Sequence, residues 1–302
     1  MNIKLAIAPI GWSNDDMPEL GAHISFEQCI KEMAEAKYQG CEIGNKFPRD
    51  PDILHAALSS HNLSVASAWY STFFTEPGRE QETIAGFIKH MTFLQTMGAK
   101  VIVVCECGHS VQGLAKPVFE NQPQFTDSEW RALVSGLHHI GELAKQNNMT
   151  IVYHPHMGTG IQHEAEIDRL MQETNPSLVS LLLDTGHLYF SGHQPLTTLQ
   201  KHGERIKHVH LKDIRDETLK QTKAQSLSFL DAVKAGVFTV PGDGCIDFEP
   251  VFQYLLKMNY QGWWVVEAEQ DPDKAVPLVY AKMAREYLRT TLARLQENEV
   301  SF

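Results

Sequence analysis

The sequence predicts an α/β fold of the (β/α)8 TIM-barrel type, built as a single domain over residues 1–302. Short apolar runs recur about eight times, and longer segments of helical periodicity separate them. The runs are continuously apolar more often than alternating, which is typical of parallel strands buried on both faces. An open, doubly wound sheet is the alternative. It usually has a glycine-rich turn after its first strand, whereas "APIGWSNDD" contains only Gly11, so the barrel is favoured.

The strands are expected where β-branched and apolar residues cluster after Gly, Asn or Pro. In chain order they are residues 4–10, 41–44, 63–70, 100–106, 150–154, 179–184, 206–213 and 263–269. Two helices have recognisable start signals, since Ser25 with Gln28 and Thr126 with Glu129 both match the capping-box pattern. Glycines are expected as C-terminal caps where helices end before strands, at Gly40, Gly98 and Gly262.

One segment, about 214–246, is longer than an ordinary connection between a strand and the next helix. It holds the short helical stretch "LSFLDAVKAG" followed by "FTVPGDGCIDF". Long loops in compact domains are commonly lids or binding loops. We therefore expect a lid-like insertion in this segment.

Composition narrows the class of partner. The formal charge of −11 argues against nucleic acid, because nucleic-acid binders usually carry a basic face. Five scattered cysteines indicate reduced thiols and a cytoplasmic protein. No apolar stretch approaches the roughly 18 residues of a membrane helix, and the first residues do not resemble a signal peptide. Homo-oligomerisation is left open.

Four successive predicted strands end in carboxylates and imidazoles. In TIM barrels the active site lies at these C-terminal strand ends. Mixed nitrogen and oxygen ligands suit a divalent first-row ion, and residues spaced by two share a face, so only one of Glu267 and Glu269 need be a ligand. Read singly, "DTGH" is also a plausible helix cap, and "HVHLKD" a plausible exposed strand end. The residues are His154 and His156, Asp184 and His187, His208, His210, Lys212 and Asp213, and Glu267 and Glu269.

The remaining strand ends carry polar and aromatic residues. Aromatic faces beside carboxylates and amides suit a hydroxylated ligand, because they offer both apolar C–H surface and hydrogen bonds. A merely polar rim is the alternative for each residue alone. These residues are Trp12, Asn14, Asp15, Asp16, Asn45, Lys46, Trp69, Tyr70, Glu106 and His109.

The motifs together resemble the sugar-isomerase-like TIM-barrel superfamily. They are "HPHMGTG" (154–160), "LLLDTGH" (181–187), "KHVHLKD" (207–213), "VPGDGCIDF" (240–248) and "GWWVVEAEQDP" (262–272). With "IAPIGWSNDDMPELG" (7–21), the resemblance narrows to the inosose dehydratase family of bacterial inositol catabolism. It implies a barrel enzyme that removes water from 2-keto-myo-inositol (scyllo-inosose), giving a trihydroxycyclohexane-dione. It also implies manganese or cobalt, with glutathione as a further requirement.

The resemblance also implies roles for residues. Asp184, His210 and Glu267 match superfamily metal ligands, and His154 stands where the superfamily usually has a fourth ligand, a glutamate. His187 matches a histidine that often touches substrate.

Loss of water beside a ketone is easiest through an enediolate, which requires a base and an acid. We expect these among His154, His156, Lys212 and Glu267, in an order that the sequence leaves open. Substrate contacts are expected from Trp12, Asn14, Lys46, His187 and Asp213.

Three other functions are compatible with parts of the pattern. A metal-dependent sugar isomerase or epimerase would use the same enediolate but return the proton. A DNA-repair endonuclease of the same superfamily would need more histidine ligands and a basic face. A non-catalytic sugar-binding barrel would keep the polar rim without needing the ligands. The charge of −11 argues against the endonuclease, and the intact set of strand-end ligands argues against the non-catalytic barrel. The mass of the product separates an isomerase or epimerase from the dehydratase, which would act on a small cyclic polyol ketone.

Overall fold

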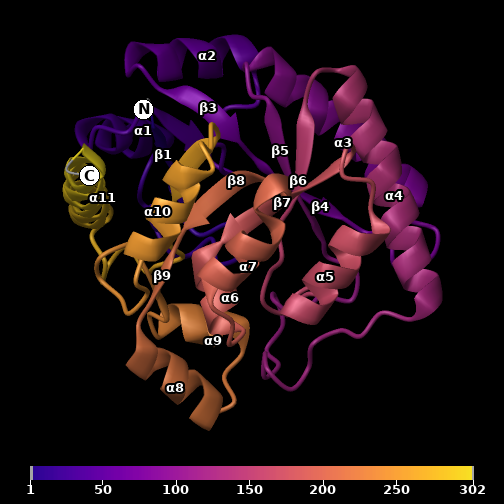
Figure 1. Cartoon of the computed structure of the whole chain (residues 1–302). Helices are drawn as coiled ribbons and strands as arrows, with labels where there is room; N and C mark the ends of the chain where they lie inside the picture. Colours follow the sequence, from indigo (N-terminus) through magenta and orange to yellow (C-terminus); the bar gives the residue numbers. More distant parts are fainter. Residues whose placement is uncertain (1–2, 301–302) are drawn as a thin grey trace.

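The computed structural model describes residues 3–300 and contains a ring of parallel strands covered by helices (Figure 1). The strand order is β3-β2-β1-β11-β8-β7-β6-β5-β4, and every neighbouring pair is parallel. The predicted (β/α)8 barrel is confirmed. Its strands are β1 Lys4–Ile7, β2 Gly40–Glu42, β3 Ser64–Ser67, β4 Trp69–Thr72, β5 Val101–Glu106, β6 Thr150–Tyr153, β7 Val179–Asp184, β8 Ile206–Leu211 and β11 Trp263–Val266.

The ring closes through the single predicted strand 63–70, which the structure divides at Ala68. The first half, β3, pairs with β2, and the second half, β4, pairs with β5. The amide of Val103 donates to the carbonyl of Ala68 across the break. The eight strands of a barrel are thus present, with the third of them shared between two hydrogen-bonding partners.

Helices follow the strands and pack outside the ring. In order they are α1 Phe26–Glu35, α2 Pro51–Ser60, α3 Glu80–Thr96, α4 Asp127–Gln146, α5 Glu164–Glu173, α6 Thr185–Phe190, α7 Pro195–His202, α10 Glu249–Lys257 and α11 Pro277–Val300. The sequence periodicity of α4 is reflected in its packing, since Trp130, Leu133, Leu137 and Ile140 are buried against the barrel. Single-turn 3₁₀ helices lie at Pro9–Gly11 and Gly203–Arg205.

The helix-start signals were more reliable than the helix-end signals. Thr126 and Glu129 form the full capping box, whereas Ser25 caps α1 alone, because the Gln28 side chain bonds to Glu32 instead. Gly98 follows α3 with a φ of +81° as expected. The predictions for Gly40 and Gly262 were wrong, since the left-handed positions after α1 and α10 belong to Lys37 and Asn259. Gly40 instead begins β2, where a Cβ would meet the ring of Trp263.

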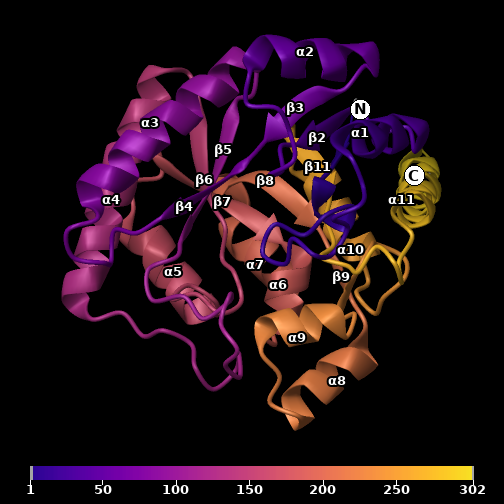
Figure 2. The same cartoon turned by 180° about the vertical axis from the view of Figure 1, so that it is seen from behind.

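The long segment after β8 forms a folded unit of its own, at the lower edge of the molecule in Figure 2. Two of its phenylalanines, Phe229 and Phe238, are fully buried and lie against the rings of His156 and His187. None of the residues that line the central cavity comes from 214–246. In this conformation the segment therefore supports the histidines from behind instead of covering the cavity. It comprises β9 Asp213–Ile214, α8 Asp216–Ala224, α9 Phe229–Lys234 and β10 Phe238–Thr239.

Two further sequence expectations can be compared with the fold. All five cysteines are free thiols. Among residues 3–300, no helix has both the length and the apolar character needed to cross a membrane.

Candidate metal and catalytic site

Four side chains from four neighbouring strands converge at one end of the barrel. His154 follows β6, Asp184 ends β7, His210 lies in β8 and Glu267 follows β11. Each offers one ligand atom, and these four atoms all lie within 4.8 Å of one another. The carboxyl ends of adjacent parallel strands meet at the same edge of a barrel, so residues more than 100 positions apart become neighbours.

Asp184 has two separate functions, one for each carboxylate oxygen. Oδ1 accepts the amide N–H of His187 at 2.8 Å and so caps the N-terminus of α6. Oδ2 faces His154 Nε2 at 3.3 Å and His210 Nδ1 at 3.5 Å, and it is buried without a hydrogen bond. The cap and the metal-ligand interpretations of "DTGH" are therefore compatible, because different atoms serve them.

The contacts of His154 define which of its nitrogens can bind a cation. Its Nδ1 lies 2.8 Å from the carbonyl oxygen of Pro155, which can only accept a hydrogen bond. The proton of the neutral ring therefore lies on Nδ1, and the Nε2 lone pair faces Asp184 Oδ2. Two electron-rich atoms 3.3 Å apart in a buried site are stabilised by a cation between them.

His210 and Glu267 complete the group of four. His210 Nδ1 lies 3.2 Å from Glu267 Oε2 and has no hydrogen-bond partner of good geometry. Burial lowers the pKa of His210, but the carboxylates of Glu267 and Glu42 outweigh it and raise the pKa well above its usual range. With nitrogen and oxygen donors and two orphaned buried ligand atoms, the group fits a divalent first-row ion.

Lys212 is a fully buried ammonium group beside these ligands. Its Nζ lies 2.8 Å from Glu267 Oε1, 2.7 Å from Glu269 Oε2 and 3.4 Å from Asp184 Oδ2. Burial lowers the pKa of Lys212, and these carboxylates reverse the effect and raise it above its ordinary value. The Lys212 stem passes so close to Gly186 that a Cβ there would lie 2.4 Å from Lys212 Cγ, so "DTGH" needs its glycine.

The rings of His156 and His187 lie tilted against each other with centroids 3.8 Å apart, and of the two only His156 lines the cavity. His187 Nδ1 accepts the amide N–H of Met157, which leaves the proton of the neutral ring on Nε2, facing Glu269 Oε1. Together with Glu269, the two histidines are spaced closely enough for a second ion. The protonated Nε2 of His187 and the adjacent Lys212 ammonium both disfavour it.

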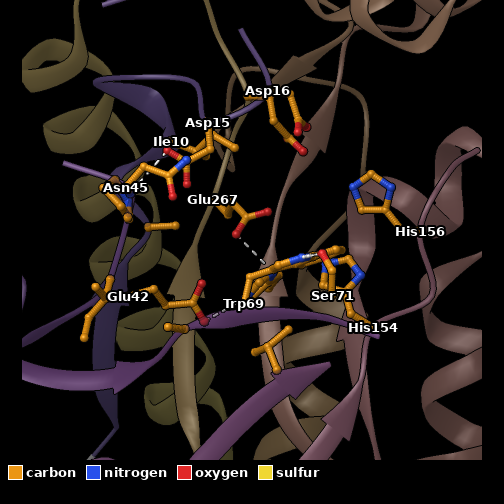
Figure 3. Close-up of a pocket in the computed structure, with 18 of the residues that line it drawn as sticks. Ile10, Asp15, Asp16, Glu42, Asn45, Trp69, Ser71, His154, His156 and Glu267 are labelled. Atoms are coloured by element: carbon orange, nitrogen blue, oxygen red, sulfur yellow. Dashed lines mark hydrogen bonds and ion pairs between the residues drawn. The ribbon is translucent and has the colours of Figure 1, made fainter. Parts of the chain in front are cut away.

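A cavity of about 450 Å³ opens above the ligand group, within the usual size range of small-molecule sites. His154, His156, His210, Glu267 and Glu269 line its barrel side. Figure 3 shows His156 facing Asp16 and Glu267 across the space, with Trp69 beside His154. The rest of the lining includes Asp15, Asp16, Glu42, Asn45, Arg49, Trp69, Ser71, His90 and Gln112.

None of the five residues expected to touch substrate lines this cavity. His187 packs against His156, which does line it, and the other four are held by contacts elsewhere. Trp12 is buried, with its Nε1 donating to Glu32 at 2.6 Å. Asn14 accepts two backbone amides of its own turn. Lys46 donates to three backbone carbonyls, and Asp213 accepts four backbone amides at the base of the insertion. All four have their polar groups occupied by structural contacts, so we do not include them in the proposed substrate contacts.

Of the other polar residues predicted at the strand ends, some line the cavity and some do not. Asp15, Asp16, Asn45 and Trp69 line the cavity. Glu106 does not, because its carboxylate accepts five hydrogen bonds from Thr72, Phe74, Thr75 and Gly108.

Glu42 is the main cavity residue that sequence reasoning missed. It is a buried carboxylate in β2 whose Oε1 contacts both His208 and His210. The sequence did contain an indication of its role, since Glu42 lies within the apolar run "CEIG" and a buried charge requires a partner.

His90 provides a prediction of acid sensitivity. Burial on α3 lowers its pKa to about 4, so the folded protein keeps His90 neutral below the unfolded value near 6.5. Between these pH values the unfolded chain binds more protons, and stability falls as the pH falls. Between pH 7 and pH 4, the protonation of His90 in the unfolded chain lowers the unfolding free energy of the wild type by up to about 3 kcal/mol. We expect His90→Gln to lack this part of the decrease. Urea titrations across that range measure it.

The exposed residue His55 provides the control. His55→Gln should follow the wild-type pH profile. Parallel pH profiles for wild type and His90→Gln would contradict the interpretation.

Comparison with known proteins places the chain in a family. The xylose isomerase-like TIM-barrel family model matches residues 16–292. Inosose dehydratase of Geobacillus thermodenitrificans (strain NG80-2) is 59% identical over 290 residues, covering 96% of this chain and 97% of the relative. Inosose dehydratase of Bacillus thuringiensis (strain Al Hakam) is 59% identical over 288 residues, covering 95% of this chain and 96% of the relative.

Solved structures agree on the fold at lower identity. The probable 3-DHS dehydratase AsbF of Bacillus anthracis superposes with a TM-score of 0.72 at 16% identity, covering 95% of this chain and 99% of AsbF. The IOLI protein with a bound zinc atom superposes with a TM-score of 0.69 at 16% identity, covering 97% of both chains. Near-complete coverage at 59% identity, on a barrel whose strand ends carry this ligand group, means that the chain belongs to the xylose isomerase-like TIM-barrel family and, within it, to the inosose dehydratases, which are lyases.

Proposed function

We propose that this protein dehydrates 2-keto-myo-inositol (scyllo-inosose) to 3D-trihydroxycyclohexane-1,2-dione in inositol catabolism, with a divalent cation held by His154, Asp184, His210 and Glu267. The observation that carries the proposal is a group of four convergent ligand atoms, two of them buried and unpaired, at the floor of a polar cavity of about 450 Å³. The full-length relatives named inosose dehydratase support the choice of substrate.

The proposed cation is manganese or cobalt. The IOLI protein, which shares the fold, has a bound zinc atom, so this kind of barrel can hold a first-row ion. When bound, the cation would supply Lewis-acid stabilisation of negative charge that develops on the ketone oxygen. Glutathione is proposed as a further requirement from the family resemblance, and none of the steps below is assigned to it.

His156 is the proposed base that removes the proton from the carbon next to the ketone. Its Nδ1 lies 2.8 Å from the carbonyl oxygen of Met157, so the ring proton lies on Nδ1 and Nε2 carries the lone pair. Burial and the neighbouring histidines lower its pKa well below the usual range, so the resting ring is neutral and its Nε2 lone pair is unprotonated. It lines the cavity directly, whereas His154 directs its lone pair at Asp184.

Lys212 is proposed to position two carboxylates instead of transferring a proton. It is fully buried and is not among the residues that line the cavity. Its ammonium group bridges Glu267 and Glu269, which fixes both carboxylates along the cavity wall. Its raised pKa makes it a weak acid, which is a further reason to assign it this electrostatic role.

The leaving hydroxide requires a proton, and Asp16 is the proposed donor. Asp16 lies at the cavity edge opposite His156 (Figure 3). Asp16 is an exposed residue, and partial desolvation beside the cavity together with the charge of Glu269 raises its pKa, in the direction of the protonated form that a general acid needs. Base and acid on opposite sides of the substrate would remove the carbon-bound proton and the hydroxyl from different faces. The enol that forms then becomes the dione by tautomerisation.

The same cavity offers surfaces for a ring polyol. The Trp69 indole, with its Nε1 bonded to Ser71, provides an apolar face for C–H groups. Asp15 and Asn45 stand at the opposite edge, where hydroxyls distant from the ketone would be placed (Figure 3).

A direct test is to incubate the purified protein with scyllo-inosose and Mn²⁺ or Co²⁺. We expect an ultraviolet-absorbing product lighter than the substrate by one water, and no product when a chelator is present. An isomerase or epimerase would give a product of unchanged mass. That outcome would replace the dehydratase proposal, since both reactions begin with the same proton abstraction.

A further inference from the structure

Glu42 makes contacts across the interior of the barrel. It lies in β2, and its Oε1 is 2.7 Å from His208 Nε2 and 3.0 Å from His210 Nε2, both in β8. Strands β1 and β11 separate β2 from β8 in the ring, so these bonds span the barrel instead of joining neighbours. One carboxylate oxygen of Glu42 therefore faces the Nε2 atoms of two imidazoles.

The consequence concerns the tautomer of His210. Carboxylates flank both of its nitrogens, with Glu42 at Nε2 and Glu267 and Asp184 at Nδ1. If the single proton of a neutral ring sat on Nδ1, it would bond to Glu267 and remove the lone pair that a cation needs. Because Glu42 accepts at Nε2, one proton can stay there when a cation displaces the other from Nδ1.

The same three residues could be read as a second cation site, since Glu42, His208 and His210 also lie within ligand distance of one another. A neutral imidazole has one lone pair. His210 can give that lone pair to the group of four or to this trio, but not to both. The group of four includes the unpaired Asp184 Oδ2 and His210 Nδ1, whereas Glu42 Oε1 is already satisfied by two donors.

We propose that Glu42 is a positioning residue that fixes the Nε2–H tautomer of His210 and thereby sets the affinity of the ligand group for a divalent cation. The proposal rests on the cation site named under the proposed function. His208 acts through Glu42, because its N–H holds the same carboxylate oxygen in place.

The experiment measures Co²⁺ binding to the metal-free protein by visible absorption, with competition by a chelator. Glu42→Leu removes the acceptor and should weaken Kd by about 10–100-fold. Glu42→Gln keeps an uncharged acceptor oxygen at the same position and should fall between wild type and Glu42→Leu. Because glutamine has nearly the same shape as glutamate, Glu42→Gln keeps the test available if Glu42→Leu does not fold.

Glu106→Gln is the matched control, since Glu106 is also a buried strand carboxylate but contacts none of the four ligands. It should lower Tm and leave the Kd for Co²⁺ within about twofold, because its bonds are structural. A loss of affinity as large as that of Glu42→Leu would attribute the effect to general destabilisation and overturn the proposal.

Other outcomes are equally decisive. An unchanged Kd in both Glu42 variants would overturn the tautomer role. If the wild type bound two Co²⁺ ions and the Glu42 variants bound only one, Glu42 would itself be a ligand, and the positioning role would be overturned. Cation binding that responds to Glu42 as expected, in a protein inactive on scyllo-inosose, would refute the proposed function and leave the positioning role intact. Absence of any Co²⁺ binding by the wild type would refute both.

Discussion

Asp184→Asn is expected to reduce kcat/KM for scyllo-inosose by at least about 10³-fold, equivalent to about 4 kcal/mol of transition-state stabilisation. The asparagine carbonyl can still accept the His187 amide and cap α6, as Oδ1 does in the wild type. The other oxygen becomes an NH₂ group that points at the Lys212 ammonium and cannot bind a cation. The substitution therefore separates the local structural function of Asp184 from its proposed ligand function.

Two measurements accompany the rate assay. Calorimetric titration with Mn²⁺ should show binding in the wild type and none in Asp184→Asn. Circular dichroism should show the same helix content in both proteins. Full activity with unchanged Mn²⁺ binding would contradict the assignment of the ligand group, whereas loss of the fold would mean that the variant tested stability alone.

Lys212→Met is expected to lower the unfolding free energy of the metal-free protein by about 3–5 kcal/mol. Methionine keeps most of the apolar stem that lies beside Gly186 and loses the ammonium group over the Phe238 ring. It removes the only lysine ammonium that contacts Glu267 and Glu269 among the described residues. The buried carboxylates of Asp184 and Glu269 and the partly buried carboxylate of Glu267 then lose their shared counter-ion. Thermal denaturation without added metal measures the effect.

A divalent cation should recover part of this loss, because it supplies positive charge at the same place. The increase in Tm on adding Mn²⁺ should therefore be larger for Lys212→Met than for the wild type. Lys201→Met is the matched control, since Lys201 pairs with Asp168 on the surface, where an ion pair is worth at most about 1 kcal/mol. Equal metal-induced shifts in wild type and Lys212→Met would show that the ammonium does not share its carboxylates with a cation.

Asp184 shows how a local sequence motif and a distant contact can depend on one side chain. The cap of α6 fixes the carboxylate in one orientation, and this leaves Oδ2 aimed at the centre of the ligand group. His154 is oriented in the same manner by the carbonyl of the next residue, Pro155. Short-range hydrogen bonds thus hold ligand atoms in position before any cation arrives, which reduces the cost of assembling the site.

The strand ends were predictable from sequence because a barrel imposes its own rule. The polar residue that ends each apolar strand lies at the same edge of the barrel. The location of His154, Asp184, His210 and Glu267 at that edge therefore followed from the alternation of strands and helices in the sequence. The division of the strand 63–70 at Ala68 did not follow, because pairing on two sides depends on how the ring closes.

The substrate contacts were less predictable than the ligand group. Lys46 and Asn45 are adjacent and polar, yet Lys46 binds three backbone carbonyls while Asn45 lines the cavity. Sequence position indicates that a residue lies in a strand-end loop. Which loop side chains satisfy backbone groups depends on the path of the loop, because buried backbone polar groups must find partners.

By itself, the sequence determined the barrel, the order of its strands and helices, and the set of strand-end residues from which the family resemblance selected the ligands. These depend on hydrophobic periodicity and on the common direction of parallel strands, both of which are written along the chain. Only the tertiary structure decided which nitrogen of each histidine is free, that Lys212 is buried between carboxylates, and that Glu42 reaches His208 and His210 across the barrel. Hydrogen-bond direction and charge pairing depend on distances between atoms far apart in sequence, and folding alone sets those distances.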